Sequence, residues 1–320
     1  MKQFEILLND NGIKYETDVD LSKKTWIHRG GKANYFVCPN NGSELEKVIS
    51  YLYDNGVFHL VIGSSSNIYI LNTTNIPVVV STLKCNNYVV KEELIECECG
   101  VQVGKLAKQM VECGIKGFEY LTKLPGTVGA AIYNNSSCKS NSISKLLLDV
   151  DVVTPEGMKT ITSEDLHFTF RSSDLKKHTI DGVVLKARLK KEYGNAEELK
   201  KTSYFNEIER KKTLEGPANN LGCTVHKAFC NGPMPIQFKI PFLIYSKMVS
   251  LFVKDELKCK RLQKSFILTI TGHKGLRPYV SDYLILTFIW KDNKADYYFD
   301  EYLDFMKKIY KTDKIEIEIF

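Results

Sequence analysis

The sequence feature that most limits the possible fold is a pair of glycine-containing turns built from small residues. The first, Gly63-Ser64-Ser65-Ser66-Asn67, directly follows the short apolar run of residues 58–62. The second lies in residues 125–131, which read Pro-Gly-Thr-Val-Gly-Ala-Ala. Small side chains leave backbone N–H groups accessible, so each turn can hold the oxygens of a phosphate or pyrophosphate. Neither turn matches Gly-x-Gly-x-x-Gly or the Walker pattern, which argues against a Rossmann or P-loop site.

The length and composition are those of a globular protein with more than one domain. A chain of 320 residues fits two or three domains, and 43% hydrophobic with 26% charged residues is a normal globular balance. The net charge of +6 is modest, and the densest basic run, residues 258–261, is short and lacks interleaved aromatics. We therefore expect no nucleic-acid partner, although a small anionic ligand would suit the positive bias.

No segment has the length of a membrane span or of a signal peptide. Residues 1–5 begin no apolar run, and apolar stretches such as residues 283–290 are far shorter than the ~20 residues that a membrane-spanning helix needs. We therefore expect a soluble, cytoplasmic protein with no membrane partner. Nothing in the sequence indicates an oligomer, so a monomer is the default expectation.

The cysteines predict neither a disulfide framework nor a metal site. There are nine of them, an odd number, and no Cys-x-x-Cys pair occurs. Cys97 and Cys99 alternate within residues 94–99, which places both on one face of a strand, where cysteine acts as a small hydrophobic residue. We expect reduced thiols and no bound metal.

Hydrophobic spacing predicts a first α/β lobe over residues 1–84. Apolar residues recur at helical spacing in residues 43–53, and short apolar runs at residues 58–62, 68–70 and 77–80 indicate buried strands. Alternating helices and strands are typical of a small α/β unit.

Two further domains are expected, over residues 85–195 and 196–320. The second combines one helix with several strands and a turn at Pro155-Glu156-Gly157. Its expected elements are strands at 88–90, 94–99, 146–153 and 182–189 and a helix at 103–113. A charged connector at residues 190–215, expected to be helical, leads into the third domain, which ends with a helix at 298–310 and a strand at 315–320.

Several motifs occur in an order that resembles a known family. They are Gly30-Gly31-x-Ala33, Gly63-x-x-Ser66-Asn67, residues 117–134, Phe170-Arg171-x-Ser173, Gly222-Cys223 and residues 315–319. The series is similar to that of the UDP-N-acetylenolpyruvoylglucosamine reductases, the MurB family of FAD enzymes in bacterial peptidoglycan synthesis. The central block is highly specific. The resemblance is good over residues 24–190 and poor over residues 228–310.

This resemblance implies a fold and a cofactor site. The fold would be α+β, of the vanillyl-alcohol-oxidase-like (PCMH) type, with two FAD-binding lobes and a third α+β substrate domain. Contacts with FAD would come from Gly63, Ser64, Ser65, Ser66, Asn67, Pro125, Gly126, Val128 and Gly129. Ser65 stands where the family usually has glycine, which costs backbone freedom but still offers an N–H and a hydroxyl to a phosphate.

The resemblance also implies a reaction and its catalytic residues. NADPH reduces FAD, and the reduced flavin transfers hydride to the enolpyruvyl ether of UDP-N-acetylglucosamine enolpyruvate, which forms UDP-N-acetylmuramate. Arg171 and Glu318 fall on the family's arginine and glutamate, which stabilise an enolate-like intermediate. Cys223 falls on the serine that donates a proton, and an ordinary thiol, with a pKa of about 8.5, releases a proton more readily than an alcohol. Phe170 replaces a tyrosine.

The departures from the family concentrate in the substrate domain. After Cys223 the chain lacks the family's Asn-Pro, and His226 and Lys227 stand as candidate phosphate contacts. The sequence therefore leaves three functions open: reduction of this or a related nucleotide sugar, FAD-dependent oxidation or reduction of another substrate, and flavin binding without catalysis. No nicotinamide motif is readable, so the choice between NADPH and NADH also stays open.

Overall fold

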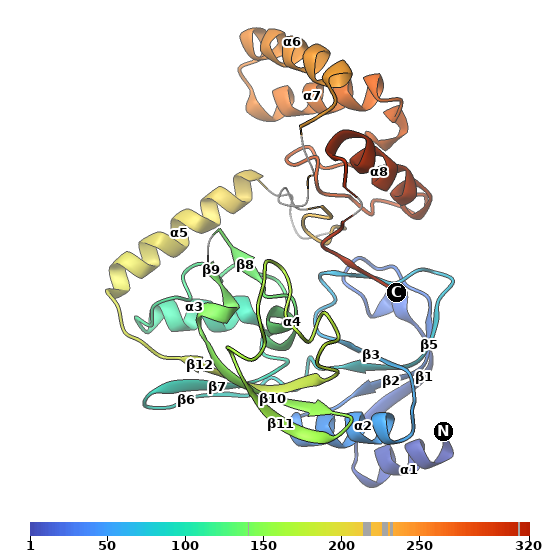
Figure 1. The fold of residues 1–320 in the computed structure, drawn as a ribbon, viewed down its shortest axis with the longest axis vertical. Helices are drawn as coiled ribbons and strands as arrows, with labels where there is room; N and C mark the ends of the chain where they lie inside the picture. Colours follow the sequence, from blue (N-terminus) through green and yellow to red (C-terminus); the bar gives the residue numbers. More distant parts are fainter. Residues whose placement is uncertain (140, 214–218, 226–229, 231–232, 313) are drawn as a thin grey trace. The chain divides into compact units, whose positions relative to one another are not determined.

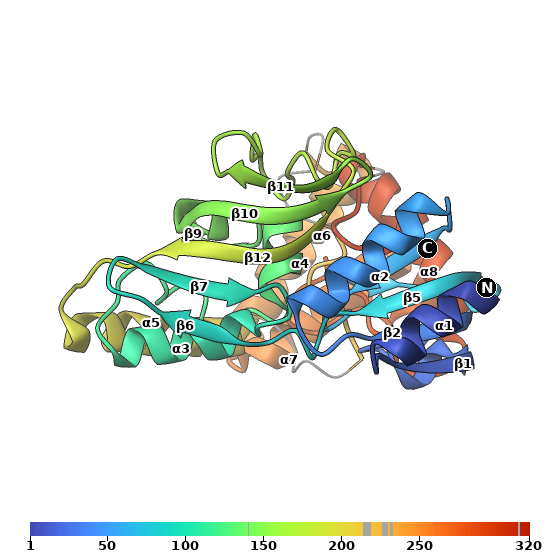
Figure 2. The ribbon, with the colours of Figure 1, turned by 90° about the horizontal axis from the view of Figure 1, so that it is seen from below.

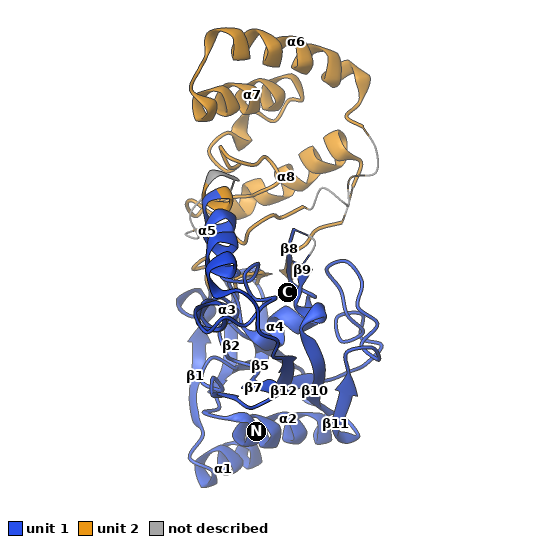
Figure 3. Cartoon of the chain, turned by 90° about the vertical axis from the view of Figure 1, so that its left-hand side faces the viewer, with its two compact units in different colours: residues 1–25, 29–65, 70–208 blue, residues 26–28, 66–69, 209–320 orange. Residues whose placement is uncertain are grey.

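The chain divides into two compact units (Figures 1 and 3). Unit 1 consists of residues 1–25, 29–65 and 70–208, and unit 2 of residues 26–28, 66–69 and 209–320. The computed structural model describes residues 1–139, 141–213, 219–225, 230, 233–312 and 314–320. The finer division into domains at residues 1–84, 85–195 and 196–320 stays a proposal.

The first sheet of unit 1 has four strands in the order β1-β2-β5-β3. These are β1 (Lys14–Asp20), β2 (Lys32–Cys38), β3 (His59–Ile62) and β5 (Asn75–Ser81). Strand β1 is antiparallel to β2, whereas β2 and β3 each run parallel to β5. The helices of this lobe are α1 (Lys2–Asp10) and α2 (Gly42–Asp54).

Helix α2 confirms the helix predicted at residues 43–53. Its apolar residues recur every three or four positions, and Leu45, Val48, Ile49 and Leu52 are fully buried. The Asn41 side chain caps the helix by accepting a hydrogen bond of 2.9 Å from the Glu44 N–H.

The second sheet of unit 1 is antiparallel, with five strands in the order β11-β10-β12-β7-β6, which lie side by side in Figure 2. They are β6 (Tyr88–Val90), β7 (Leu94–Glu98), β10 (Leu147–Thr154), β11 (Gly157–Thr162) and β12 (Val183–Lys190). Cys97 and Cys99 are both buried in the hydrophobic core, which confirms the interpretation of these cysteines as core residues.

The other elements of unit 1 connect or cover the sheets. They are α3 (Val103–Glu112), α4 (Val128–Tyr133), the hairpin of β8 (Ser137–Cys138) and β9 (Asn141–Ser142), and the short 3₁₀ helices at Leu21–Lys23 and Ile143–Lys145. Helix α5 (Ala196–Thr213) begins in unit 1 and confirms that the charged connector is helical. The Ser203 hydroxyl lies 3.0 Å from that of Thr122, and Lys123 pairs with Glu207 at 3.1 Å.

Unit 2 is largely helical. It contains α6 (Ile236–Phe252), α7 (Glu256–Ile270), a 3₁₀ turn at Lys274–Leu276, α8 (Ala295–Tyr310) and the parallel pair of β4 (Ile68–Tyr69) and β13 (Glu318–Ile319). Its core is aromatic: Phe288 lies 4.8 Å from Trp290 and 5.2 Å from Tyr302, measured between ring centroids.

Two features of unit 2 differ from the sequence-based expectations. The strand predicted at residues 315–320 is shorter, with only Glu318–Ile319 paired, to Ile68 and Tyr69 of β4. Helices α6 and α7 were not predicted. Helix α6 is apolar on nearly all sides, so it lacks the alternation of apolar and polar faces by which a surface helix is recognised.

Candidate active site

The two small-residue turns predicted to hold FAD meet in unit 1. Gly63 follows the end of β3, and its Cα faces the side chain of Thr127. A Cβ atom on residue 63 would lie 2.4 Å from Thr127 Oγ1 and 3.0 Å from its Cγ2, closer than side chains tolerate. The absence of a side chain at Gly63 therefore allows the two turns to touch.

Ser65 adopts the backbone conformation that favours glycine. Its φ is +49° and its side chain is buried. The Ser65 hydroxyl donates a hydrogen bond of 2.8 Å to the Ser64 carbonyl oxygen. The left-handed region costs a residue with a Cβ about 1–2 kcal/mol. Ser65 thus keeps the turn geometry of a glycine at an energetic cost, as expected from its place in the motif.

Replacing Ser65 with glycine should stabilise the protein by about 0.5–1 kcal/mol. The gain is the left-handed penalty reduced by the greater freedom of glycine in the unfolded chain, about 0.4–1 kcal/mol. Urea unfolding of the flavin-free protein measures the difference. Ser64→Gly serves as the control: Ser64 has no positive φ, so this change should destabilise. An equal loss of unfolding free energy in the two variants would contradict the conclusion that the left-handed backbone of Ser65 costs stability.

Two backbone N–H groups of the second turn form hydrogen bonds with other parts of unit 1. The Val128 N–H donates to the Val101 carbonyl oxygen and the Gly129 N–H to that of Cys99, both at 2.8 Å. The expectation that the N–H groups of this turn face a pyrophosphate is therefore wrong for these two residues. Within the described part of the chain, the Gly126 and Thr127 N–H groups have no hydrogen-bond partner.

Gly126 and Gly129 are required by the geometry of this turn. Gly126 has a φ of +100°, which side chains rarely allow. A Cβ on residue 129 would lie 2.9 Å from the Cβ of Cys99, so Gly129 lets helix α4 rest on the end of β7. Gly63 and Gly129 therefore allow close packing between protein segments, whereas Gly126 provides the positive φ of the turn, next to the N–H groups of Gly126 and Thr127 that could hold the predicted FAD pyrophosphate.

Arg171 lies at the tip of a tight hairpin. Thr169 and Ser172 exchange two backbone hydrogen bonds of 3.0 and 3.2 Å, which leaves Phe170 and Arg171 as the turn residues. The φ of Arg171 is +55°, and its guanidinium carbon lies 5.9 Å from the centroid of the Phe170 ring. The Asn135 amide nitrogen donates a hydrogen bond of 2.8 Å to the Thr169 carbonyl oxygen. The hairpin is therefore held both by its own backbone hydrogen bonds and by a hydrogen bond from the Asn135 side chain.

The anchor is the C-terminal end of helix α4. The Ser173 hydroxyl donates to the Tyr133 carbonyl oxygen, and the Lys176 ammonium group donates to the Asn134 side-chain oxygen, both at 2.8 Å. Hydrogen bonds from His167 and Lys177 hold the pKa of the neighbouring Asp174 carboxyl below its ordinary value. Because α4 has six residues and rises about 9 Å, it sets the spacing between the second turn and the Arg171 hairpin.

Asn135 is a functional candidate that the sequence did not reveal. Its side chain is buried, its φ is +42°, and within the described residues its Oδ1 has no hydrogen-bond partner. A buried amide oxygen without a donor is costly unless a ligand or water supplies one. The only sequence signal was its position directly after the glycine-rich block.

Asn135→Gly should loosen the Arg171 hairpin. Glycine accepts the positive φ, so the variant removes mainly the hydrogen bond to Thr169, about 1 kcal/mol or a fivefold change in the open population. Trypsin cleavage after Arg171 should accelerate by about that factor. Asn86→Gly, in an exposed loop, is the control. An unchanged cleavage rate in Asn135→Gly would show that this bond does not hold the hairpin.

Unit 2 brings Asn67, Cys223 and Glu318 onto neighbouring segments. The Asn67 amide nitrogen donates to the Glu316 carbonyl oxygen at 3.0 Å, and the Glu318 N–H donates to the Asn67 carbonyl oxygen at 2.9 Å. The Glu316 N–H donates to the carbonyl oxygen of Thr224, the residue after Cys223, at 2.8 Å. Backbone hydrogen bonds thus connect the predicted proton donor with the predicted glutamate.

Tyr302 packs next to Thr224, one of the residues in this hydrogen-bonded connection, and the sequence analysis did not single it out. It is fully buried, its hydroxyl donates to the Ile285 carbonyl oxygen at 3.2 Å, and it is hydrogen-bonded to the Thr224 side chain. Burial raises the pKa of the Tyr302 phenol well above its ordinary value, so it stays neutral. Its place in helix α8 was predictable, but its contact with Thr224 depends on tertiary structure.

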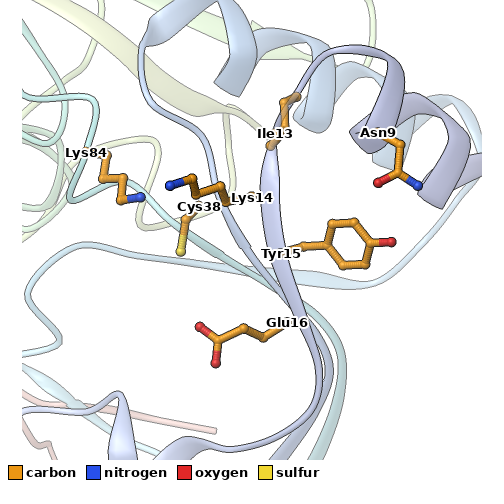
Figure 4. Close-up of a pocket in the computed structure, with 7 residues that line it drawn as sticks. All are labelled: Asn9, Ile13, Lys14, Tyr15, Glu16, Cys38 and Lys84. Atoms are coloured by element: carbon orange, nitrogen blue, oxygen red, sulfur yellow. The ribbon is translucent and has the colours of Figure 1, made fainter.

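The remaining predicted site residues are distributed as follows. Arg171 belongs to unit 1, and Cys223 and Glu318 belong to unit 2. His226 and Lys227 lie outside the described residues. A cavity of about 430 Å³ lies elsewhere in unit 1, lined by Asn9, Ile13, Lys14, Tyr15, Glu16, Cys38 and Lys84 (Figure 4). None of its lining residues is a predicted site residue.

Comparison with known proteins agrees with the cofactor and the fold inferred from these residues. The family described as FAD binding domain matches residues 33–163. The solved structure of the UDP-N-acetylenolpyruvylglucosamine reductase (MurB) from Thermus caldophilus superposes with a TM-score of 0.68 at 18% identity. The match covers 96% of this chain and 99% of that one. The predicted α+β, vanillyl-alcohol-oxidase-like FAD-binding fold is thus confirmed.

Two curated relatives carry the name UDP-N-acetylenolpyruvoylglucosamine reductase. The protein from Streptococcus uberis is 30% identical over 212 residues, which are 65% of this chain and 69% of the relative. The protein from Caldicellulosiruptor saccharolyticus is 29% identical over 214 residues, 66% of this chain and 68% of the relative. The chain therefore belongs to the UDP-N-acetylenolpyruvoylglucosamine reductase family.

Proposed function

We propose that this protein uses FAD and NADPH to reduce the enolpyruvyl ether of UDP-N-acetylglucosamine enolpyruvate. The product would be UDP-N-acetylmuramate, a precursor of peptidoglycan, made in the cytoplasm by a monomer. The observation that carries the proposal is the hydrogen-bonded connection in unit 2 from Thr224 through Glu316 to Asn67 and Glu318. It fixes the main chain of the segments that carry Cys223 and Glu318 beside Asn67, a residue of the first flavin turn.

The second small-residue turn of unit 1 fits the cofactor. We assign Gly63 and Gly126 to the FAD contacts; among the described residues the Gly126 and Thr127 N–H groups have no hydrogen-bond partner, so they are available to the oxygens of a pyrophosphate. Ser64, Ser65, Ser66, Asn67, Pro125, Val128 and Gly129 complete the proposed contacts. Bound FAD would supply the hydride that it accepts from NADPH.

The side chains of this chain would supply the charge and the proton that the reduction needs. Hydride adds to one carbon of the enolpyruvyl double bond, and the neighbouring carbon must then receive a proton. Cys223 Sγ–H donates that proton and is afterwards reprotonated from solvent. The Arg171 guanidinium and the Glu318 carboxyl group are assigned the stabilisation of the negative charge that develops toward the substrate carboxylate before protonation. The substrate is reduced by two electrons, and NADPH is oxidised by two.

The substrate diphosphate would be held by residues that follow Cys223. We propose His226 and Lys227 for this role, because a cation near a diphosphate provides charge-assisted hydrogen bonds. Lys227→Met should raise KM for the nucleotide sugar while leaving flavin reduction by NADPH unchanged.

Measuring NADPH oxidation with and without UDP-N-acetylglucosamine enolpyruvate tests the function. We expect rapid reduction of the flavin in both cases and multiple turnovers only with the sugar. NADH in place of NADPH identifies the preferred reductant. Reduction of the flavin by NADPH, followed by slow reoxidation that does not depend on the sugar, would exclude this substrate and favour another one. A purified protein without flavin absorbance would refute every flavin-dependent function.

A further inference from the structure

Helix α6 presents a continuous apolar face to solvent. Ile236, Ile240, Ile244, Met248 and Phe252 follow one another at intervals of four residues, and each is more than half exposed. Residues at this spacing lie on one side of a helix. Leu243 and Leu251 extend the same side, and Phe252 reaches 83% exposure. Soluble domains rarely expose such contiguous apolar patches unless the patch binds something.

The opposite side of α6 is held by the rest of unit 2. Val249 is buried, and the Tyr245 ring stacks on Phe266 of α7 with centroids 4.0 Å apart. The Lys308 ammonium group of α8 lies 5.5 Å from the centroid of the Phe238 ring. Figures 1 and 3 both show α7 between α6 and most of α8, so α6 forms the outer layer of this unit. The apolar face is therefore a feature of the folded unit, not of a detached helix.

The segment made of α6 and the first part of α7 is positively charged, and Lys239 and Lys247 belong to α6 itself. Helix α6 contains no acidic residue, and residues 236–264 hold seven lysines and arginines against two acids, five of the six net positive charges of the chain. Lys260, Arg261 and Lys264 are paired with Glu256 or Asp282. Four exposed lysines have no ion pair among the described residues: Lys239, Lys247, Lys254 and Lys258. An occupant of this face must accept both apolar and cationic groups.

We propose that α6 binds the surface of a bilayer that contains anionic lipids. Its apolar side chains would enter the boundary between head groups and acyl chains, about 5–10 Å deep. The lysine stems would extend along that boundary and place their ammonium groups among the lipid phosphates. A second copy of this chain fits less well, because a two-fold contact between α6 helices would bring the same lysines together.

This binding does not require a membrane-spanning segment. Among the described residues, no helix combines the length and the apolar character needed to cross a bilayer, and α6 has 17 residues. The expectation of no membrane partner considered spanning segments only. Surface binding depends instead on an exposed apolar face with flanking cations, and that feature became visible only when the packed side of α6 was known.

Co-sedimentation of the full-length flavoprotein with lipid vesicles tests the proposal. One set contains phosphatidylcholine alone, and the other includes about one-third phosphatidylglycerol. We expect at least about tenfold stronger binding to the anionic vesicles, weakened by high salt. Ile240→Ser/Ile244→Ser should lower this binding by at least about tenfold. The matched control is Val89→Ser/Met158→Ser, whose side chains in unit 1 are 57% and 59% exposed.

Circular dichroism and flavin content verify that each variant is folded. Lys239→Gln/Lys247→Gln should reduce the preference for anionic vesicles by about tenfold without affecting folding. Absence of binding to either kind of vesicle overturns the proposal, and so does equal binding to both. Lipid-free self-association in analytical ultracentrifugation that is lost in Ile240→Ser/Ile244→Ser would assign this face to a second copy instead.

Discussion

Cys223→Ala should slow the reoxidation of the reduced flavin by the enolpyruvyl sugar by about 10²- to 10⁴-fold, the usual contribution of a positioned acid or base. Hydride transfer to the substrate stays unproductive when no group protonates the neighbouring carbon. Alanine leaves the backbone bonds of Thr224 and Glu316 in place, so the loss reports the thiol itself. Single-turnover stopped-flow absorbance of the prereduced enzyme measures the rate.

Three controls separate loss of the Cys223 proton donor from other effects of the substitution. Flavin reduction by NADPH should be unchanged, because that half-reaction needs no proton from Cys223. Cys113→Ala, an exposed cysteine of unit 1, should behave as the parent protein. Cys223→Ser should retain most of the rate if thiol and hydroxyl are interchangeable. A serine variant as slow as alanine rejects interchangeability, and an alanine variant as fast as the parent removes Cys223 from the mechanism.

Gly63→Ala should weaken FAD binding by about 10- to 100-fold, which corresponds to the 1–3 kcal/mol typical of an added methyl group in a packed site. The new Cβ would lie 2.4 Å from Thr127 Oγ1, so the two flavin turns must separate. Thr127 is buried and β-branched, which leaves it little freedom to turn away. Fluorescence titration of the apoprotein with FAD measures the dissociation constant.

A second substitution should restore binding. In Gly63→Ala/Thr127→Ala the nearest atom of residue 127 is its Cβ, 3.3 Å away, a tight but tolerable contact. We expect the double variant to bind FAD within about tenfold of the parent, a coupling that independent sites do not show. Gly42→Ala is the matched control, because its nearest neighbour is the Glu98 carboxylate at 3.5 Å. Tight FAD binding by Gly63→Ala alone would disprove the contact between the turns.

Local patterns predicted the parts of the fold in which one element determines its own conformation. Residues 94–99 form a strand with both cysteines inward because side-chain alternation has a period of two. Residues 43–53 form a helix because their apolar residues recur at helical spacing. The order of short motifs predicted the family and FAD, although, of the glycines in the two flavin turns, only Gly126, with its positive φ, meets a requirement that is local to its turn.

Helix α6 shows where local patterns fail. Its sequence is apolar on both the packed and the exposed side, and it contains Pro241, so periodicity does not distinguish it from a buried segment. Only the contact with α7 identifies which side faces inward. Asn135 and Tyr302 were overlooked for a similar reason, because their importance depends on Thr169 and Thr224, which are distant in sequence.

The sequence by itself determined the cofactor class, the family and the residue types available for catalysis, because these depend on short motifs in a given order. The tertiary structure decided how the two small-residue turns are used. It placed Gly63 against Thr127, directed the Val128 and Gly129 N–H groups into the fold, and gave those of Gly126 and Thr127 no acceptor among the described residues. The physical reason is that each backbone N–H takes the acceptor that packing brings near, and segments 64 residues apart meet only in the folded chain.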